Sequence, residues 1–348
     1  MSVRRHTASV RGTHRRPDDL EALHTAVIDW FARHERPLPW RRPGTSAWGV
    51  LVSEVMSQQT PMSRVAPRWT EWMRKWPTPA DLASASTADV LLAWDTLGYP
   101  RRALRLQECA RVIVADHGGQ VPNDEDTLLS LPGIGAYTAA AVAGFAFGAR
   151  TAILDVNIRR VLARAVDGHE HPGSATKAEA AWARELLPQE PQQSVRWNAG
   201  TMELGALVCT SRSPRCEDCP LLSSCAWVLA GKPSSPERKP KTQAWHGTDR
   251  QLRGAIMGLL RTAHGCPVRA DLLVAGTVDF DVDATLVLPT EVQDGIAKVR
   301  RLADGTRVSR LIDDLEADGL LCRQPPEQPG AHSGSVLTLP QGQTRSDQ

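Results

Sequence analysis

Four cysteines lie close together near the middle of the sequence and could bind a metal. Cys209, Cys216, Cys219 and Cys225 fall within "CTSRSPRCEDCPLLSSC". Four thiolates in one short loop can hold either a tetrahedral zinc ion or an iron–sulfur cluster, and the softness of the ligands does not separate the two. No secretory signal is visible, so we expect a reducing cytoplasm, where clustered cysteines favour metal over disulfides.

A glycine turn precedes an alanine-rich segment in "LPGIGAYTAAAVAGFAF". Gly133 and Gly135 would let the backbone come close to a ligand, and the free amides at a helix start favour an anion such as phosphate. A G-x-G turn is also common between ordinary helices, so the motif alone is a weak indication.

Two carboxyl groups have surroundings that indicate a chemical role. Glu54 interrupts the apolar stretch "WGVLVSEVM", where desolvation would raise its pKa toward that of a general acid. Asp155 begins a predicted helix in "AILDVNIRR", where the helix dipole would keep it ionised, and Asn157 could orient it. Taken singly, a Glu on a helix is usually solvated and an Asp at a helix start is usually only a cap.

The elements that must position these groups are mostly helices. Between residues 18 and 231, apolar side chains recur at helical spacing and Gly or Pro separates the segments, while strand patterns are nearly absent. We therefore predict a mainly α domain over residues 18–231. Its clearest helical segments are residues 18–35, 87–98, 102–119, 157–166 and 177–188.

The remainder of the chain divides by composition. At 348 residues two domains are the expectation, and the formal net charge of +2 does not itself indicate nucleic acid. No apolar run reaches membrane length, so we expect no membrane association, and we predict a monomer. We predict a basic disordered tail (or phosphate-seeking arm) at 1–17, a linker at 232–246, a small α/β, winged-helix-like module at 247–323 with its best strand signal in 276–290, and a disordered tail at 324–348.

Together these motifs resemble the MutY family of adenine DNA glycosylases, in the helix-hairpin-helix, iron–sulfur DNA glycosylase superfamily that includes endonuclease III. The resemblance spans about Leu20 to Trp227 and rests on the cysteine spacing, on "LPGIG" followed by Asp155, and above all on "SEVMSQQT". It implies a two-lobed helix-hairpin-helix fold and a [4Fe–4S] cluster rather than zinc on the four cysteines. It also implies that the cluster loop presents Arg212 and Arg215 to DNA phosphates.

The resemblance also implies a role for individual residues. Glu54 would protonate the adenine, and Asp155, with Asn157, would stabilise the cationic sugar. Tyr137 stands where strand-cleaving relatives have Lys, which implies a monofunctional glycosylase because a phenol cannot form a Schiff base. The implied DNA contacts are Trp40 and Arg41 at the adenine pocket, Gln58, Gln59 and Thr60 at the duplex wedge, and Leu97 and Tyr99 beside the opposite base.

The implied activity is removal of adenine opposite 8-oxoguanine or guanine in double-stranded DNA. The alternatives are a thymine or uracil mismatch glycosylase of the same fold and a non-catalytic iron–sulfur DNA-binding protein. Two features depart from the family pattern. Ala199 stands where relatives often have Gln or Glu, and the strand-rich pattern of a Nudix-like domain does not follow Pro240.

Overall fold

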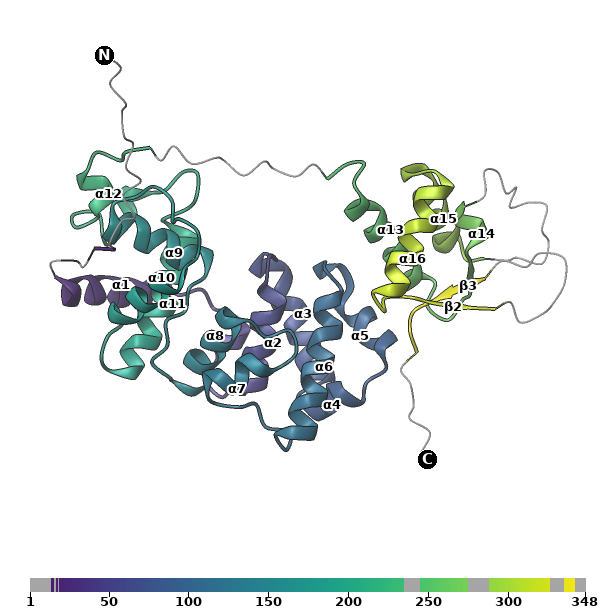
Figure 1. Cartoon of the computed structure of the whole chain (residues 1–348), viewed down its shortest axis with the longest axis horizontal. Coiled ribbons are helices and arrows are strands. Elements are labelled where there is room, and N and C mark those ends of the chain that lie inside the picture. Colours follow the sequence, from purple (N-terminus) through teal and green to yellow (C-terminus); the bar gives the residue numbers. More distant parts are fainter. Residues whose placement is uncertain are drawn as a thin grey trace, which may run out of the picture. The chain divides into compact units, whose positions relative to one another are not determined.

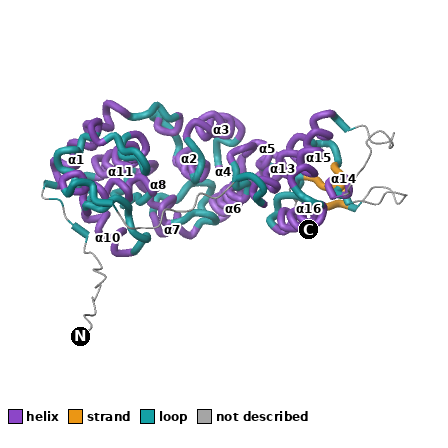
Figure 2. The backbone as a smooth tube through the Cα atoms, turned by 90° about the horizontal axis from the view of Figure 1, so that it is seen from above, coloured by secondary structure: helices purple, strands orange, loops and turns teal. Residues whose placement is uncertain are grey.

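The computed structural model describes residues 14, 15, 17, 19–234, 245–274, 288–325 and 335–341, which are mostly helical (Figure 1, Figure 2). They fall into two compact units that each gather distant segments of the chain. The first comprises residues 1–38, 123–129 and 134–239, and the second comprises residues 39–122, 130–133 and 240–348. None of the helices in the described ranges is long and apolar enough to cross a membrane. The mainly α prediction is confirmed.

The first unit is a helical bundle with an apolar core. Leu23, Val27 and Phe31 recur at helical spacing on one helix and are buried against the longest helix of the unit. The regular elements of this unit are α1 (Leu20–His34), α7 (Glu125–Ser130, whose last residue is in the second unit), α8 (Ala136–Phe147), α9 (Val156–Leu162), the π-helical turn η3 (Ala163–Asp167), α10 (Lys177–Glu185), α11 (Pro191–Leu207), η4 (Cys216–Asp218) and α12 (Ala226–Leu229).

A lobe of the second unit is built around tryptophans. Trp72 packs edge-on against Trp76 and Trp94, with ring centroids 4.6 and 5.6 Å apart. This large buried ring surface stabilises a set of short helices that individually bury little. The elements of this lobe are η1 (Pro39–Arg41), α2 (Ala47–Ser57), α3 (Met62–Lys75), α4 (Pro79–Ser84), α5 (Thr87–Trp94), η2 (Asp95–Leu97) and α6 (Arg101–Asp116).

The same unit contains a small C-terminal α/β module (Figure 1). Its elements are α13 (Asp249–Thr262), β1 (Val268–Arg269), α14 (Asp271–Val274), α15 (Thr290–Leu302), α16 (Gly305–Ala317), β2 (Cys322–Gln324) and β3 (Val336–Thr338). Buried side chains of α13, α15 and α16 form one apolar cluster that also includes Ala88 and Leu91 of α5. The module therefore shares its core with the tryptophan lobe. The strand signal predicted in 276–290 lies mainly outside the described residues.

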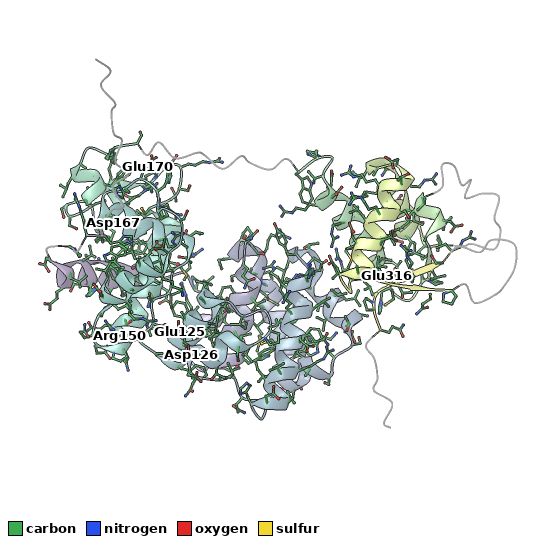
Figure 3. All side chains as sticks on the ribbon, viewed as in Figure 1. Glu125, Asp126, Arg150, Asp167, Glu170 and Glu316 are labelled. Atoms are coloured by element: carbon green, nitrogen blue, oxygen red, sulfur yellow. The ribbon has the colours of Figure 1, made fainter. Side chains whose placement is uncertain are left out.

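The antiparallel sheet of the module has the order β1–β3–β2. The prediction of a disordered tail at 324–348 is therefore wrong for residues 336–338, which form the central strand. Leu337 and Leu339 are buried, whereas Val336 and Thr338 are only half-buried, so the two leucines alternate inward. Glu316 at the end of α16 accepts a hydrogen bond from the Arg323 amide at 3.2 Å, which ties that helix to β2 (Figure 3).

Two residues of the predicted N-terminal tail make ordered contacts. The ring of His14 stacks on Trp182 at 4.4 Å, and Nδ1 of His14 lies 2.8 Å from a carboxylate oxygen of Asp167. The indole of Trp182 donates to the carbonyl of Arg15 at 2.7 Å. The prediction of disorder is wrong for His14 and Arg15, because a packed indole gives them a partner. Most of the tail, residues 1–13, lies outside the described residues.

Removal of the central strand tests this architecture. Truncation after Gln324 deletes β3 together with two buried leucines, each of which contributes about 1.5–3 kcal/mol. We expect faster amide hydrogen exchange throughout α13 and α16. A truncation after Gln341, which keeps β3, is the control. Unchanged protection of α13 in the longer deletion would contradict the sheet.

Candidate active site

Glu54 lies on α2, a helix whose middle is buried on every side. Ser46 caps the start of α2 by accepting from the Gly49 amide at 3.1 Å. Residues 48–56 are all buried, and Glu54 is 8% exposed among apolar neighbours. Burial disfavours the charged form of a carboxyl group, so this position is compatible with a proton donor and unlike that of a solvated surface residue.

Two loops of the second unit bring together residues from different parts of the sequence. The hydroxyl of Thr60 donates to the carbonyls of Gln58 and Leu97, at 3.2 and 3.3 Å. Thr60 and Leu97 are buried, Gln58 is half-buried, and Gln59 and Tyr99 are exposed. The predicted wedge residues and the predicted wall residues are therefore neighbours, with Gln59 and Tyr99 turned most fully to solvent.

Arg102 at the start of α6 holds both loops. One terminal nitrogen donates to the carbonyls of Val55, Met56 and Gln58 at 3.0, 3.2 and 2.5 Å. The other donates to the Thr60 hydroxyl and to the carbonyls of Leu97 and Gly98, at 3.1, 3.3 and 3.0 Å. One guanidinium thus joins the end of α2, which carries Glu54, to the loop that carries Tyr99.

The two loops are strained, which explains why they need such a partner. Gln59 has φ +54° and Tyr99 has φ +49°, values that residues other than glycine rarely adopt. Each costs on the order of 1–3 kcal/mol. Burial lowers the pKa of Arg102 to about 10, so the guanidinium still carries its charge at neutral pH while it binds the carbonyls.

Trp40 and Arg41 lie on η1, beside α2 and α3. The Trp40 ring packs edge-on against Trp69 at 5.9 Å, and Trp69 donates its indole N–H to the Gly49 carbonyl of α2 at 2.8 Å. Trp40 and Arg41 are both half-buried. The two predicted pocket residues are therefore positioned against the helix that carries Glu54.

The glycine turn joins α7 to α8, which agrees with the expected helix-hairpin-helix. Gly133 has φ +77°, and a Cβ added there would lie 2.9 Å from Cβ of Arg105, so the fold itself requires glycine. Gly135 caps α8 without a side chain, and a Cβ at Gly135 would meet nothing within 4 Å. The space above Gly135 is open to a ligand.

Asp155 caps α9 in the first unit and forms a fully bonded carboxyl group. One oxygen accepts from the amides of Asn157 and Ile158 at 3.0 and 2.6 Å, and the other from the Asn157 side chain at 2.8 Å. Burial raises the pKa of Asp155, and these hydrogen bonds and Arg160 oppose that rise. The expectation that the helix start alone keeps the group ionised was incomplete, because desolvation is the largest effect.

Arg160, on the same helix, connects this carboxyl group to the cysteine loop. It donates to the Asn157 side-chain oxygen at 2.7 Å and to the carbonyl of Cys209 at 2.7 Å. It also donates to the Gly205 carbonyl on α11 at 2.7 Å, where a Cβ on Gly205 would lie 2.7 Å from Cβ of Asn157. Asn157 is therefore fixed by a close helix contact and by hydrogen bonds on both sides of its amide.

The four predicted cysteine ligands line one cavity. Apolar side chains, Arg164 and Arg215 complete its wall, and Arg164 donates to the Cys209 sulfur at 3.4 Å. Burial raises the pKa of Cys219 to about 12 and also raises that of Cys225, while the neighbouring thiolates add repulsion. Within the described ranges, no three His, Cys, Asp or Glu side chains are grouped so as to hold a metal ion.

The remaining predicted residues lie at the surface of the first unit or near it. Arg212 and Arg215 are exposed on the cysteine loop. Arg215 donates to the Leu207 carbonyl at 2.7 Å and lies 3.6 Å from Asp218, so part of its charge is already compensated. Tyr137 is half-buried in the first turn of α8.

Sequence reasoning missed the three arginines that connect these parts. Arg102, Arg160 and Arg164 lie on helices with ordinary periodicity, and each binds backbone carbonyls more than 40 residues away, as in the pair of Arg102 with Val55. The clearest available signal was in "NIRRVLARAV", where Arg160 falls among apolar positions of the helix.

The chain is similar in sequence to known proteins. Residues 52–185 match the family described as "HhH-GPD superfamily base excision DNA repair protein". An adenine DNA glycosylase of Mycobacterium tuberculosis is 50% identical over 256 residues, which cover 73% of this chain and 84% of that protein. An adenine DNA glycosylase of Mycolicibacterium smegmatis is 47% identical over 279 residues, with coverage of 80% and 93%.

A solved structure has a fold similar to that of this chain. The structure of a thermostable thymine-DNA glycosylase matches with a TM-score of 0.55 and 27% sequence identity. The match covers 61% of this chain and 97% of that one.

Substitution of Arg102 tests whether it holds the two loops. Arg102→Met keeps the aliphatic stem but removes the charge-assisted hydrogen bonds, so we expect the free energy of unfolding to fall by about 2–4 kcal/mol. Hydrogen exchange should accelerate selectively at residues 57–60 and 95–99. Arg111→Met, an exposed position on the same helix, is the matched control. Equal exchange in both variants would refute the role of Arg102.

Proposed function

We propose a function from the premise that the chain belongs to the adenine DNA glycosylase family, within the HhH-GPD superfamily of base excision DNA repair proteins. It is a DNA N-glycosylase that releases adenine from DNA. The observation that carries this conclusion is the 50% identity over 256 residues, which cover 73% of this chain and 84% of that protein. Its substrate is double-stranded DNA in which adenine is mispaired with 8-oxoguanine or guanine, and it acts as a monomer at the nucleoid.

The chemistry of the bond determines the role of each carboxyl group. Adenine leaves deoxyribose poorly as an anion, so a ring nitrogen of the base takes a proton as the C–N bond breaks. Glu54 donates this proton from its buried position on α2. The bonding electrons leave with the base, and the sugar becomes an oxocarbenium-like cation. Water then adds to C1′ and releases a proton to the solvent, from which Glu54 is protonated again.

Asp155 stabilises the sugar cation. Its carboxylate is oriented by the Asn157 side chain and by two amides of α9, so the negative charge does not need to reorganise as the cation develops. Arg160 holds Asn157 in place from the other side. Tyr137, in place of a lysine, leaves no amine to capture the sugar, which supports a monofunctional enzyme.

Several residues support DNA binding. Gly135 and the start of α8 offer open backbone to a phosphate, and Arg212 supplies an exposed cation on the cysteine loop. The adenine must leave the base stack, at a cost of a few kcal/mol. Gln59 and Tyr99 are exposed on the loops that Arg102 holds, where they can fill the space and contact the opposite strand.

The [4Fe–4S] cluster that we propose would be held by the four cysteines. They line one cavity and the fold offers Arg164 as a donor to a cysteine sulfur. Burial favours the neutral thiols in the absence of a cation, and iron binding would compensate for the charge of four thiolates. When bound, the cluster supplies a structural tie for the loop and takes no part in bond cleavage. Arg160 and Arg164 connect this loop to α9 and so to Asp155.

A mismatch panel with one variant tests the reaction. We expect excision of adenine opposite 8-oxoguanine and opposite guanine, with no release of thymine or uracil opposite guanine. Glu54→Gln should lower the single-turnover rate by at least about a hundredfold, because it removes the proton donor, while leaving DNA affinity intact. Glu71→Gln, an exposed position, is the control. Release of a pyrimidine alone would establish the mismatch glycosylase alternative instead.

Metal analysis of anaerobically purified protein tests the cluster. We expect iron and acid-labile sulfide in equal amounts, and their loss in Cys219→Ser because this thiol lines the cavity. Cys266→Ser, outside that cavity, should keep both. Stoichiometric zinc without sulfide would overturn the assignment.

A further inference from the structure

A chain of alternating aromatic rings and guanidinium groups connects the tryptophan lobe to the C-terminal module. The Arg102 guanidinium carbon lies 5.2 Å from the Trp94 ring centroid and 5.6 Å from that of Tyr99. The Arg250 guanidinium carbon lies 4.9 Å from the Tyr99 centroid and 5.3 Å from that of Trp245. The Tyr99 ring thus contacts one cation from α6 and another from α13.

Other contacts anchor α13 against this lobe, so Arg250 is held by more than its own side chain. Asp318 after α16 pairs with Arg253 on α13, and it also lies 3.2 Å from Arg101 on α6. Arg261 at the end of α13 lies 3.9 Å from Asp95, four residues before Tyr99. The shared apolar cluster of α5 and α13 supplies the bulk of the contact.

The position of Arg250 does not stabilise its own helix, α13. It lies in the first turn of α13, where the helix dipole disfavours a cation by a few tenths of a kcal/mol. It is exposed, and it forms no ion pair among the residues that the structure describes. Its charge remains available over the Tyr99 ring.

The Tyr99 ring needs an external partner. It is 43% exposed and its backbone is strained at φ +49°, so packing covers only part of the ring. The loop below it is fixed by Arg102, whose hydrogen bonds reach Leu97 and Gly98. The hydrogen bonds of the loop do not fix the direction of the Tyr99 ring. Contacts of the ring with cations determine that direction.

We propose that the C-terminal module, through Arg250, positions Tyr99 against the base opposite the excised adenine and so sets the preference for that base. This inference rests on the proposed function. An aromatic ring stacks on a nucleobase, and a neighbouring cation attracts the phosphates of the same strand. Trp245, 48% exposed, extends the ring surface along that strand. Arg250 is a positioning residue and takes no part in the reaction.

Single-turnover excision by full-length Arg250→Ala tests the proposal, with adenine opposite 8-oxoguanine or opposite guanine. We expect the ratio of the two rates to fall about two- to fivefold, the size of one exposed cation–π contact. Arg250→Lys, which keeps a cation, should restore part of the ratio. Arg301→Ala removes an equal charge from an exposed position of α15 and should leave the ratio unchanged.

A double-mutant cycle shows whether Arg250 acts through Tyr99. In a Tyr99→Ala background, Arg250→Ala should have no further effect on the ratio, because its partner ring is gone. The proposal is overturned if Arg250→Ala and Arg301→Ala change the ratio of the two rates equally. It is also overturned if the effects of Arg250→Ala and Tyr99→Ala on that ratio are additive. Wild-type protein that releases adenine from neither duplex would refute the proposed function itself, which is a separate result.

Discussion

The site depends on buried guanidinium groups that bind backbone carbonyl oxygens. Irregular loops leave carbonyls without partners, and an arginine offers five donors in a planar fork that can reach several of them. Arg102 does this for the loops at residues 55–60 and 97–98, and Arg164 does it for the cysteine loop through the carbonyls of Thr210 and Ser211. In both cases a helix fixes the stem of the arginine side chain. The guanidinium group therefore holds the loop backbone in a defined position relative to that helix.

The cost of burying these charges explains where they occur. Desolvation lowers the pKa of Arg102 to about 10 and also lowers that of Arg160, so each cation is destabilised by its site and stabilised by its hydrogen bonds. The hydrogen bonds of such an arginine can offset the strain of a backbone with positive φ, as at Gln59 and Tyr99. A side chain can also satisfy the backbone in a local turn, as Thr78 does in front of α4.

Periodicity predicted most of the fold, and the exceptions have physical reasons. The segments predicted at 18–35, 87–98, 102–119, 157–166 and 177–188 correspond to α1, α5, α6, α9 and α10, because each of these helices buries apolar side chains at helical spacing in the core of its own unit. β3 was missed because its three residues lie in a segment rich in Pro, Gly and Gln, and its burial comes from pairing on both sides rather than from its own pattern.

The carboxyl groups and cysteines of the candidate site could be predicted from short motifs, since each motif is local in sequence. Arg102 could not. Its six acceptors come from two segments, and four of them lie more than 40 residues before it. In "PRRALRL" it looks like one of several surface arginines, and only the fold shows that its neighbour Arg101 is exposed while Arg102 is half-buried.

Tyr99 shows how a strong and a weak restraint combine at one residue. Six hydrogen bonds from Arg102 fix the loops around its backbone, and breaking them would leave buried acceptors unsatisfied. Its ring depends on two cation–π contacts of about 0.5–1 kcal/mol each, enough to favour one orientation about five- to thirtyfold. A duplex that offers a stacking partner of similar strength can therefore turn the ring without disturbing the loop. In the role that we propose, Tyr99 would adjust to the opposite base while the helix that carries Glu54 stays in place.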